Sequence, residues 1–262
     1  MYNLVDAHCH LQDYRLVAVI DDVICRALQQ HVGSMMCCGT EENDWEQVLD
    51  LSSAHHEIKA ALGIHPWFAS GITGDAWKDR LCSLLQAHPQ AIVGEIGLDY
   101  MLENVAHEQQ EKIFIDQLRI AREYCRPVTL HCRSAFGRLA DILAHEGGVP
   151  HGGMLHAYSG SSDMVRIFEK LGLYISFSGS ITYPEHKRTC AAAAAVSLNR
   201  LLIETDSPDN RPAEVTRNSN EPANLTHVVR ALAVIKKCSV DDIAAHTTAN
   251  ALKVYSCAFS SQ

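Results

Sequence analysis

The stretch Ala91-Ile92-Val93-Gly94-Glu95-Ile96 is a short run of apolar and small residues that contains one charged side chain. Its apolar residues show little alternation with polar ones, a pattern typical of parallel strands that are buried on both faces. Seven further short apolar runs are spread along the 262 residues. They cover residues 4–5, 32–38, 58–64, 128–130, 153–155, 173–177 and 201–203.

The segments between these runs carry apolar residues at helical spacing. We expect helices over residues 17–30, 45–54, 77–87, 108–124, 136–145 and 164–171, and a helical tail over 225–236 and 240–255. Buried runs that alternate with helices predict an α/β fold, a (β/α)8 TIM barrel, formed by residues 1–262 as a single domain. The alternative is a doubly wound open sheet, which we disfavour because no GxGxxG motif opens a helix after the first run.

The composition is that of an ordinary globular protein, with 47% hydrophobic and 20% charged residues. The net charge of -9 argues against sequence-independent electrostatic binding to duplex DNA, although bound metal ions can still attract phosphate locally. The 10 cysteines include no CxxC pair and the start of the chain lacks a signal-peptide pattern, so we expect reduced thiols and a cytoplasmic location. No apolar run approaches the roughly 18–20 residues that cross a membrane.

Metal-binding residue types follow several of the buried runs. His8 and His10 come after the first run and would share one face of a strand, which makes them half of a divalent-metal site unless they lie in a solvated turn. In a (β/α)8 barrel the C-terminal strand ends meet at one rim, where the chemistry takes place. Other residues of these types at predicted strand ends are Glu95, His131, His156 and Asp206.

Four imidazoles and two carboxylates are more than one tetrahedral zinc needs, and they fit two divalent ions. We assign catalytic roles to both carboxylates: Glu95 as the bridge between the ions, and Asp206 as a ligand that also accepts the proton of the attacking water. Alternatively, His131 and His156 are structural rim histidines and Glu95 is a carboxylate at a helix N-terminus. The placements support one another and favour the metal site.

Longer motifs extend this pattern over the length of the chain. They are Asp6-Ala7-His8-Cys9-His10-Leu11, Gly63-Ile64-His65-Pro66, Gly94-Glu95-Ile96-Gly97-Leu98-Asp99-Tyr100, His156-Ala157-Tyr158-Ser159-Gly160-Ser161, Glu204-Thr205-Asp206-Ser207-Pro208 and Asn220-Glu221-Pro222-Ala223-Asn224. Together they resemble the motifs of the TatD family of metal-dependent deoxyribonucleases, within the metal-dependent hydrolase superfamily of (β/α)8 barrels. The loop over residues 208–220 matches the family only loosely and could contact the substrate.

The resemblance implies two divalent ions, with Zn, Mg and Mn among the candidates. One ion would be held by His8, His10, Glu95 and Asp206, and the other by Glu95, His131 and His156. The resemblance also implies that His65 lies near the substrate phosphate.

Residues beside the ligands are candidates for supporting roles. Asp6 would orient a metal ligand or cap a turn, and Glu204 would support a ligand or form a structural salt bridge. Arg133 is the candidate for contact with a substrate phosphate, with Arg138 as a second, although such arginines more often solvate a helix.

Two further pairs lie near the predicted rim. Asp99 and Tyr100 would shape the substrate entrance. Trp67 and Phe68 would pack as part of the rim or, alternatively, stack on single-stranded nucleic acid.

The leading functional hypothesis is a deoxyribonuclease that hydrolyses DNA phosphodiester bonds with a metal-activated water at a two-metal site. DNA would then be the partner, bound locally near the metals. The alternative is a two-metal hydrolase of a small amide, lactone or phosphoester, because the fold does not fix the substrate. A non-catalytic metal-binding or scaffold protein ranks last, because both the proposed bridge and the proposed base are present.

Overall fold

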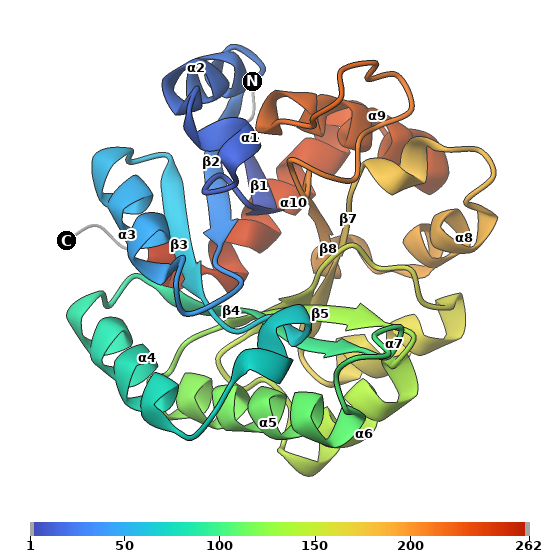
Figure 1. Ribbon diagram of the computed structural model, residues 1–262. Coiled ribbons are helices and arrows are strands. Elements are labelled where there is room, and N and C mark those ends of the chain that lie inside the picture. Colours follow the sequence, from blue (N-terminus) through green and yellow to red (C-terminus); the bar gives the residue numbers. More distant parts are fainter. Residues whose placement is uncertain (1–2, 260–262) are drawn as a thin grey trace.

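The computed structural model describes residues 3–259 and contains a single sheet of eight parallel strands in the order β1 to β8 (Figure 1). Each strand pairs with the next one along the chain, in parallel. The strands are β1 (Leu4–Cys9), β2 (Val32–Cys38), β3 (Ile58–Leu62), β4 (Ile92–Asp99), β5 (Val128–Arg133), β6 (Gly153–Leu155), β7 (Leu173–Phe177) and β8 (Leu201–Ile203). This order confirms the predicted barrel and excludes the doubly wound sheet, whose strand order reverses at a switch point.

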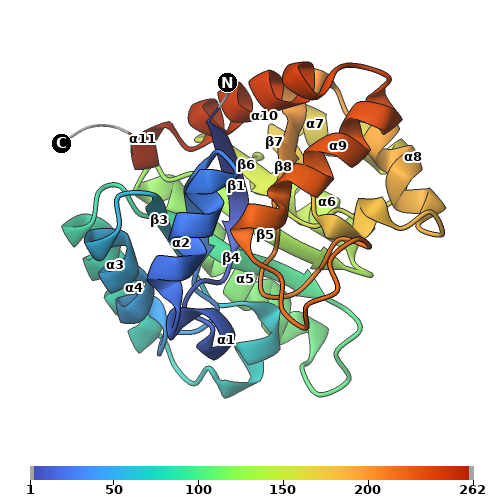
Figure 2. The same ribbon diagram turned by 90° about the horizontal axis from the view of Figure 1, so that it is seen from above.

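Helices surround the strands in both views (Figures 1 and 2). They are α1 (Tyr14–Val17), α2 (Ile20–Gln29), α3 (Trp45–Ala54), α4 (Ala76–Ala87), α5 (His107–Glu123), α6 (Phe136–His145), α7 (Ser162–Lys170), α8 (Lys187–Ala195), α9 (Leu225–Lys236), α10 (Val240–Val254) and α11 (Ser256–Phe259). Four 3-10 turns, η1 (Pro66–Gly71), η2 (Gly179–Thr182), η3 (Leu198–Arg200) and η4 (Pro222–Asn224), lie in the connections. The helix predicted over 17–30 corresponds to α2, which begins three residues later because the chain leaves helical geometry at Val19, with φ -130° and ψ 30°. Val17 is the last residue of the separate helix α1.

The two edges of the sheet meet just beyond the ends of β1 and β8. The Asp206 N–H donates to the His8 carbonyl at 2.9 Å, and the His10 N–H donates to the Ser207 carbonyl at 2.7 Å. These bonds bring the segment after β8 against the end of β1. They also hold Asp206 with a left-handed φ of 53°, a conformation that Asp tolerates better than most residues.

The core has an outer layer between strands and helices and an inner layer inside the ring of strands. The inner layer is continued at one end by Ala251 and Val254 of α10, Tyr255, and Ala258 of α11. Figure 2 shows α10 and α11 at the end of the molecule opposite α1, which follows the C-terminal end of β1. The C-terminal helices therefore close the barrel at the N-terminal ends of its strands, and the other end remains available for a site.

Strands β4 and β5 approach each other closely at Gly97, which has a φ of 150°. A Cβ at this position would overlap the His131 carbonyl oxygen. We expect Gly97→Ala to lower the free energy of unfolding by about 3 kcal/mol or more, measured by urea denaturation. The control is Gly137→Ala in α6, where a Cβ has open space and should leave stability unchanged or raise it by about 0.5 kcal/mol. Equal stability of the two variants would contradict this account of β4.

All 10 cysteines are free thiols, as the sequence predicts. Over residues 3–259, no helix is long and apolar enough to cross a membrane.

Candidate metal centre

The six predicted ligands converge at the C-terminal ends of the strands, although they come from positions up to 198 residues apart along the chain. His8 lies in β1, Glu95 in β4 and His131 in β5, while the remaining three residues lie one to three positions beyond the end of a strand. Those three are His10, His156 and Asp206. Four of the six side chains are buried, and those of His10 and His131 are partly buried.

Glu95 is the centre of this group because its two carboxylate oxygens face different imidazoles. Oε2 lies 3.2 Å from His8 Nε2 and 3.4 Å from His10 Nε2. Oε1 lies 3.0 Å from His131 Nδ1 and 2.9 Å from His156 Nε2. The carboxylate is therefore shared between two clusters of nitrogen donors.

The first cluster is completed by Asp206. Its Oδ1 lies 3.6 Å from His8 Nε2 and 3.5 Å from His10 Nε2, and these two nitrogens are 3.2 Å apart. Ligand atoms at 2.0–2.2 Å from a tetrahedral ion are separated by roughly 3.3–3.6 Å. The donor atoms of His8, His10, Glu95 and Asp206 therefore have the spacing that one small divalent ion requires.

The second cluster contains three donors. His131 Nδ1 and His156 Nε2 are 3.1 Å apart, and each lies within 3.0 Å of Glu95 Oε1. Three protein donors with a free fourth position are typical of catalytic zinc sites. The two clusters adjoin each other, since the His8 and His156 rings stack with their centroids 4.1 Å apart.

In the first cluster, the outward-facing nitrogen of each imidazole lies near a hydrogen-bond acceptor. His10 Nδ1 donates to the Cys38 carbonyl at 2.8 Å, and His8 Nδ1 lies 3.2 Å from Thr129 Oγ1. With hydrogens on these Nδ1 atoms, the two Nε2 atoms would be free to bind a cation as ligands.

The second cluster has carboxylates in the same supporting positions. His131 Nε2 lies 3.4 Å from Asp99 Oδ2, and His156 Nδ1 lies 3.4 Å from Glu204 Oε1. The latter pair is close but not aligned as a hydrogen bond, and the Ala157 N–H donates to the same oxygen at 2.6 Å. A carboxylate behind an imidazole raises its basicity as a metal ligand.

Both central carboxylates are ionised at neutral pH. Burial alone would raise the pKa of Glu95, but the neighbouring imidazoles, chiefly those of His156 and His65, hold that pKa well below its ordinary value. Burial would also raise the pKa of Asp206, but the hydrogen bond from His10 and nearby imidazole charge lower it to about 2. The site thus combines two ionised carboxylates with several nitrogen donors, the chemistry that suits a divalent cation.

His65 also lies in this centre. Its Nδ1 accepts a hydrogen bond from the Trp67 backbone N–H at 3.1 Å, so in the neutral ring the hydrogen is on Nε2. That Nε2 lies 3.3 Å from Glu95 Oε1. Burial lowers the pKa of His65 to about 4, so at neutral pH it is an uncharged N–H donor beside the second cluster.

Asp6 lies behind the site and contacts Thr205, not a ligand ring. Its Oδ1 accepts from the Thr205 N–H at 2.8 Å, and its Oδ2 accepts from the Thr205 hydroxyl at 2.5 Å. This buried carboxylate ties β1 to the segment after β8, which carries Asp206. It positions the site through the backbone.

The two arginines considered for phosphate contact differ in their surroundings. Arg133 is exposed at the end of β5, in register with Asp99 on β4. Arg138 in α6 forms an ion pair with Glu111, which also accepts from the Tyr100 hydroxyl at 2.6 Å. Arg138 is therefore engaged with α5, whereas Arg133 lies at the rim.

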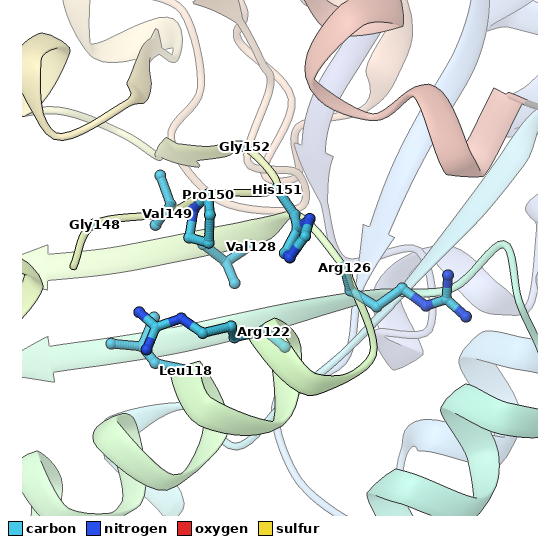
Figure 3. A pocket seen from close by; sticks show the side chains of 10 residues that line it. Leu118, Arg122, Arg126, Val128, Gly148, Val149, Pro150, His151 and Gly152 are labelled. Atoms are coloured by element: carbon cyan, nitrogen blue, oxygen red, sulfur yellow. The ribbon is translucent and has the colours of Figure 1, made fainter. Parts of the chain in front are cut away.

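The pocket in Figure 3 lies elsewhere, at the N-terminal ends of β5 and β6, where Val128 and Gly152 line it. It has room for about one water molecule, and Arg126 points away from Val149 and Pro150 in this view. The metal-type residues are at the opposite end of the same strands, so this pocket is separate from the candidate centre.

Sequence reasoning missed Thr129 and the Cys38 carbonyl as partners of the imidazoles, and treated Asp99 only as a rim residue. Two of these contacts could have been predicted from the sequence. Thr129 is two residues before His131, and Asp99 is four residues after Glu95, so strand alternation places each on the same face as the ligand. The contact with the Cys38 carbonyl depends on how β1 and β2 are placed and has no counterpart in the sequence.

Comparison with known proteins identifies the relatives of this arrangement. The family model for TatD-related DNases matches residues 5–256. The chain belongs to the TatD-related DNase family. This confirms the resemblance seen in the sequence motifs.

Relatives of this TatD-family protein match it over most of their length. The Bacillus subtilis protein YabD, named an uncharacterized metal-dependent hydrolase, is 30% identical over 96% of this chain and 98% of its own length. The protein named 3'-5' ssDNA/RNA exonuclease TatD from Enterobacter lignolyticus is 32% identical over 81% of this chain and 84% of its own. The crystal structure of YjjV, a TatD homologue from Escherichia coli, is 31% identical, covers 96% of this chain and 97% of its own, and superimposes with a TM-score of 0.92.

Proposed function

We propose that this TatD-family protein is a divalent-metal-dependent deoxyribonuclease that hydrolyses DNA phosphodiester bonds at a two-metal site. The observation that carries the proposal is the division of the Glu95 carboxylate, with one oxygen among the His8 and His10 nitrogens and the other between His131 and His156. A carboxylate shared in this way supports two ions a few ångströms apart, the arrangement found in many phosphodiester hydrolases.

The donor set supports divalent ions such as Zn, Mn or Mg. The first ion would be held by His8, His10, Glu95 and Asp206, and the second by Glu95, His131 and His156. When bound, such ions supply Lewis acidity toward phosphoryl oxygens and lower the pKa of water toward neutrality.

The other side chains have roles that follow from their protonation. Asp206 is ionised and accepts the proton of the attacking water. His65 is neutral, and its Nε2–H, which lies beside Glu95, would donate to a phosphate oxygen. Arg133, exposed at the rim, would contact a phosphate further along the strand.

DNA as the substrate is supported by the family and by the name of the Enterobacter relative, a 3'-5' exonuclease of single-stranded DNA and RNA. The net charge of -9 is consistent with contacts confined to the metal centre, and so with attack at single-stranded ends in preference to a duplex.

The test is cleavage of end-labelled single-stranded DNA, duplex DNA and RNA by the purified protein with Mg²⁺, Mn²⁺ or Zn²⁺, and again after chelation. We expect metal-dependent shortening of single-stranded DNA. A folded, metal-loaded protein that leaves every nucleic acid intact, while it turns over a small amide, lactone or phosphoester, would overturn the proposal.

Asp99 offers a milder test of the second metal position. Replacing Asp99 with Asn removes the carboxylate behind His131. We expect the affinity for metal to fall by about 10- to 100-fold, measured by titration with a metal-competing dye. Asp116→Asn, which loses ion pairs with Lys78 and Lys112 away from the metal-type residues, is the control and should bind metal normally. Indistinguishable affinities of the two variants would argue against His131 as a ligand.

A further inference from the structure

The rim beside the second cluster carries an unusually exposed indole. Trp67, the second residue of η1, is 54% exposed, while Trp45 and Trp77 are 0% and 3% exposed. A large aromatic surface left in water forgoes the stabilisation that its burial would bring. The position of Trp67 therefore calls for an explanation other than packing.

The exposed indole is nevertheless fixed on two sides. Its Nε1–H donates to Asp99 Oδ2 at 2.8 Å, and the same carboxylate oxygen faces His131 Nε2 at 3.4 Å. Its ring meets the His65 ring in a T-shaped contact with the centroids 4.9 Å apart. An aromatic ring held in this way binds a ligand with little loss of side-chain entropy.

A second exposed apolar residue is hydrogen-bonded to the same carboxylate through its backbone. The Met101 N–H donates to Asp99 Oδ1 at 3.0 Å, and the Met101 side chain is 55% exposed. Asp99 thus holds two exposed apolar residues at the mouth of the site, one through each oxygen. Phe68, 36% exposed, follows Trp67 in η1 and enlarges this apolar rim.

Trp67 lies close to the proposed metal centre, and this proximity restricts which part of a substrate the rim can contact. The His65 ring, which Trp67 contacts, places its Nε2 3.3 Å from Glu95 Oε1. A phosphodiester held at Glu95 would carry a flat aromatic base within reach of the indole. Base stacking is tolerant of sequence and needs no positive charge, which suits a protein with a net charge of -9.

We propose that Trp67 is a stacking platform for the base of the nucleotide whose phosphate lies at the metal centre, an inference that rests on the proposed nuclease function. Trp67 is a substrate-positioning residue here, because it stacks on the base while the groups around Glu95 act on the phosphate. The platform favours an unpaired base, because a base within a duplex does not expose its face.

The experiment compares wild type, Trp67→Ala and Trp67→Phe on two single-stranded DNA oligonucleotides, one normal and one abasic at the nucleotide that is cleaved. On the normal oligonucleotide we expect Trp67→Ala to raise KM by roughly 5- to 150-fold with little change in kcat. Trp67→Phe keeps a ring without the N–H and should recover much of the loss. On the abasic oligonucleotide, wild type and Trp67→Ala should be similar. Metal content, measured in parallel, should be the same in all three proteins.

The outcomes separate this inference from the function on which it rests. A wild-type protein that cleaves neither oligonucleotide with any metal overturns both. If the wild type cleaves and Trp67→Ala loses as much on the abasic as on the normal oligonucleotide, only the platform is wrong. A loss of kcat or metal in both variants would show that the hydrogen bond to Asp99 is what matters, and would also overturn stacking.

Discussion

Glu95→Gln should lower kcat by at least about 10³-fold and reduce the bound metal from two ions per chain to one or none. The neutral amide retains the shape of the side chain but loses the charge that both nitrogen clusters share. Two divalent ions close together repel each other strongly unless an anion lies between them. The loss of several kcal/mol of transition-state stabilisation, at about 1.4 kcal/mol per decade, gives this expected rate effect. Metal analysis by mass spectrometry and cleavage kinetics would be measured on the same samples.

The matched control is Glu146→Gln. Glu146 follows α6 and forms an ion pair with the exposed side chain of Arg119 in α5. Its neutralisation weakens this one ion pair, in which the Glu146 side chain is largely covered, and should leave metal content and kcat unchanged. If Glu95→Gln kept two ions and near-normal turnover, Glu95 would not be a bridge.

Asp206→Asn should lower kcat by about 10²- to 10⁴-fold while the protein retains most of its metal. The amide oxygen can still contact an ion near His8 and His10, but the amide cannot accept a proton as the carboxylate does. Asn also tolerates the left-handed backbone at this position, so folding should be preserved. Cleavage rates measured at saturating DNA, together with metal content, separate loss of the base from loss of the ion.

Asp241→Asn, in the exposed first turn of α10, is the control for this change and should behave as wild type. Two results would count against the role given to Asp206. One is undiminished turnover by Asp206→Asn. The other is a loss of turnover that excess metal fully restores, which would make Asp206 a ligand and not a base.

The strand order and the composition of the site were predictable because both follow from local pattern. Runs such as 91–96 and 173–177 are apolar without alternation, and only a parallel sheet covered by helices buries such runs on both faces. Once the barrel is assumed, its geometry brings the ends of distant strands together. Histidines as far apart as His8 and His156 could therefore be placed in one ring.

Details that depend on where a strand ends and on how closely neighbouring strands pair were not predictable from the sequence. The short apolar run at 4–5 does not fix where β1 ends, which is at Cys9, with His8 inside the strand and His10 just beyond it. Hydrogen bonding between β4 and β5, permitted by Gly97, keeps Asp99 within the strand and beside His131. The exposed, anchored state of Trp67 likewise depends on a contact with Asp99, 32 residues away in the sequence.

The central claim is that Glu95 bridges two metal ions, and anomalous scattering from crystals grown with Mn²⁺ or Zn²⁺ tests it most directly. We predict two peaks at the C-terminal end of the barrel. One should lie within bonding distance of Glu95 Oε2 and the nitrogens of His8 and His10, and the other within bonding distance of Glu95 Oε1 and His131. A single peak, or two peaks of which only one contacts Glu95, would contradict the account.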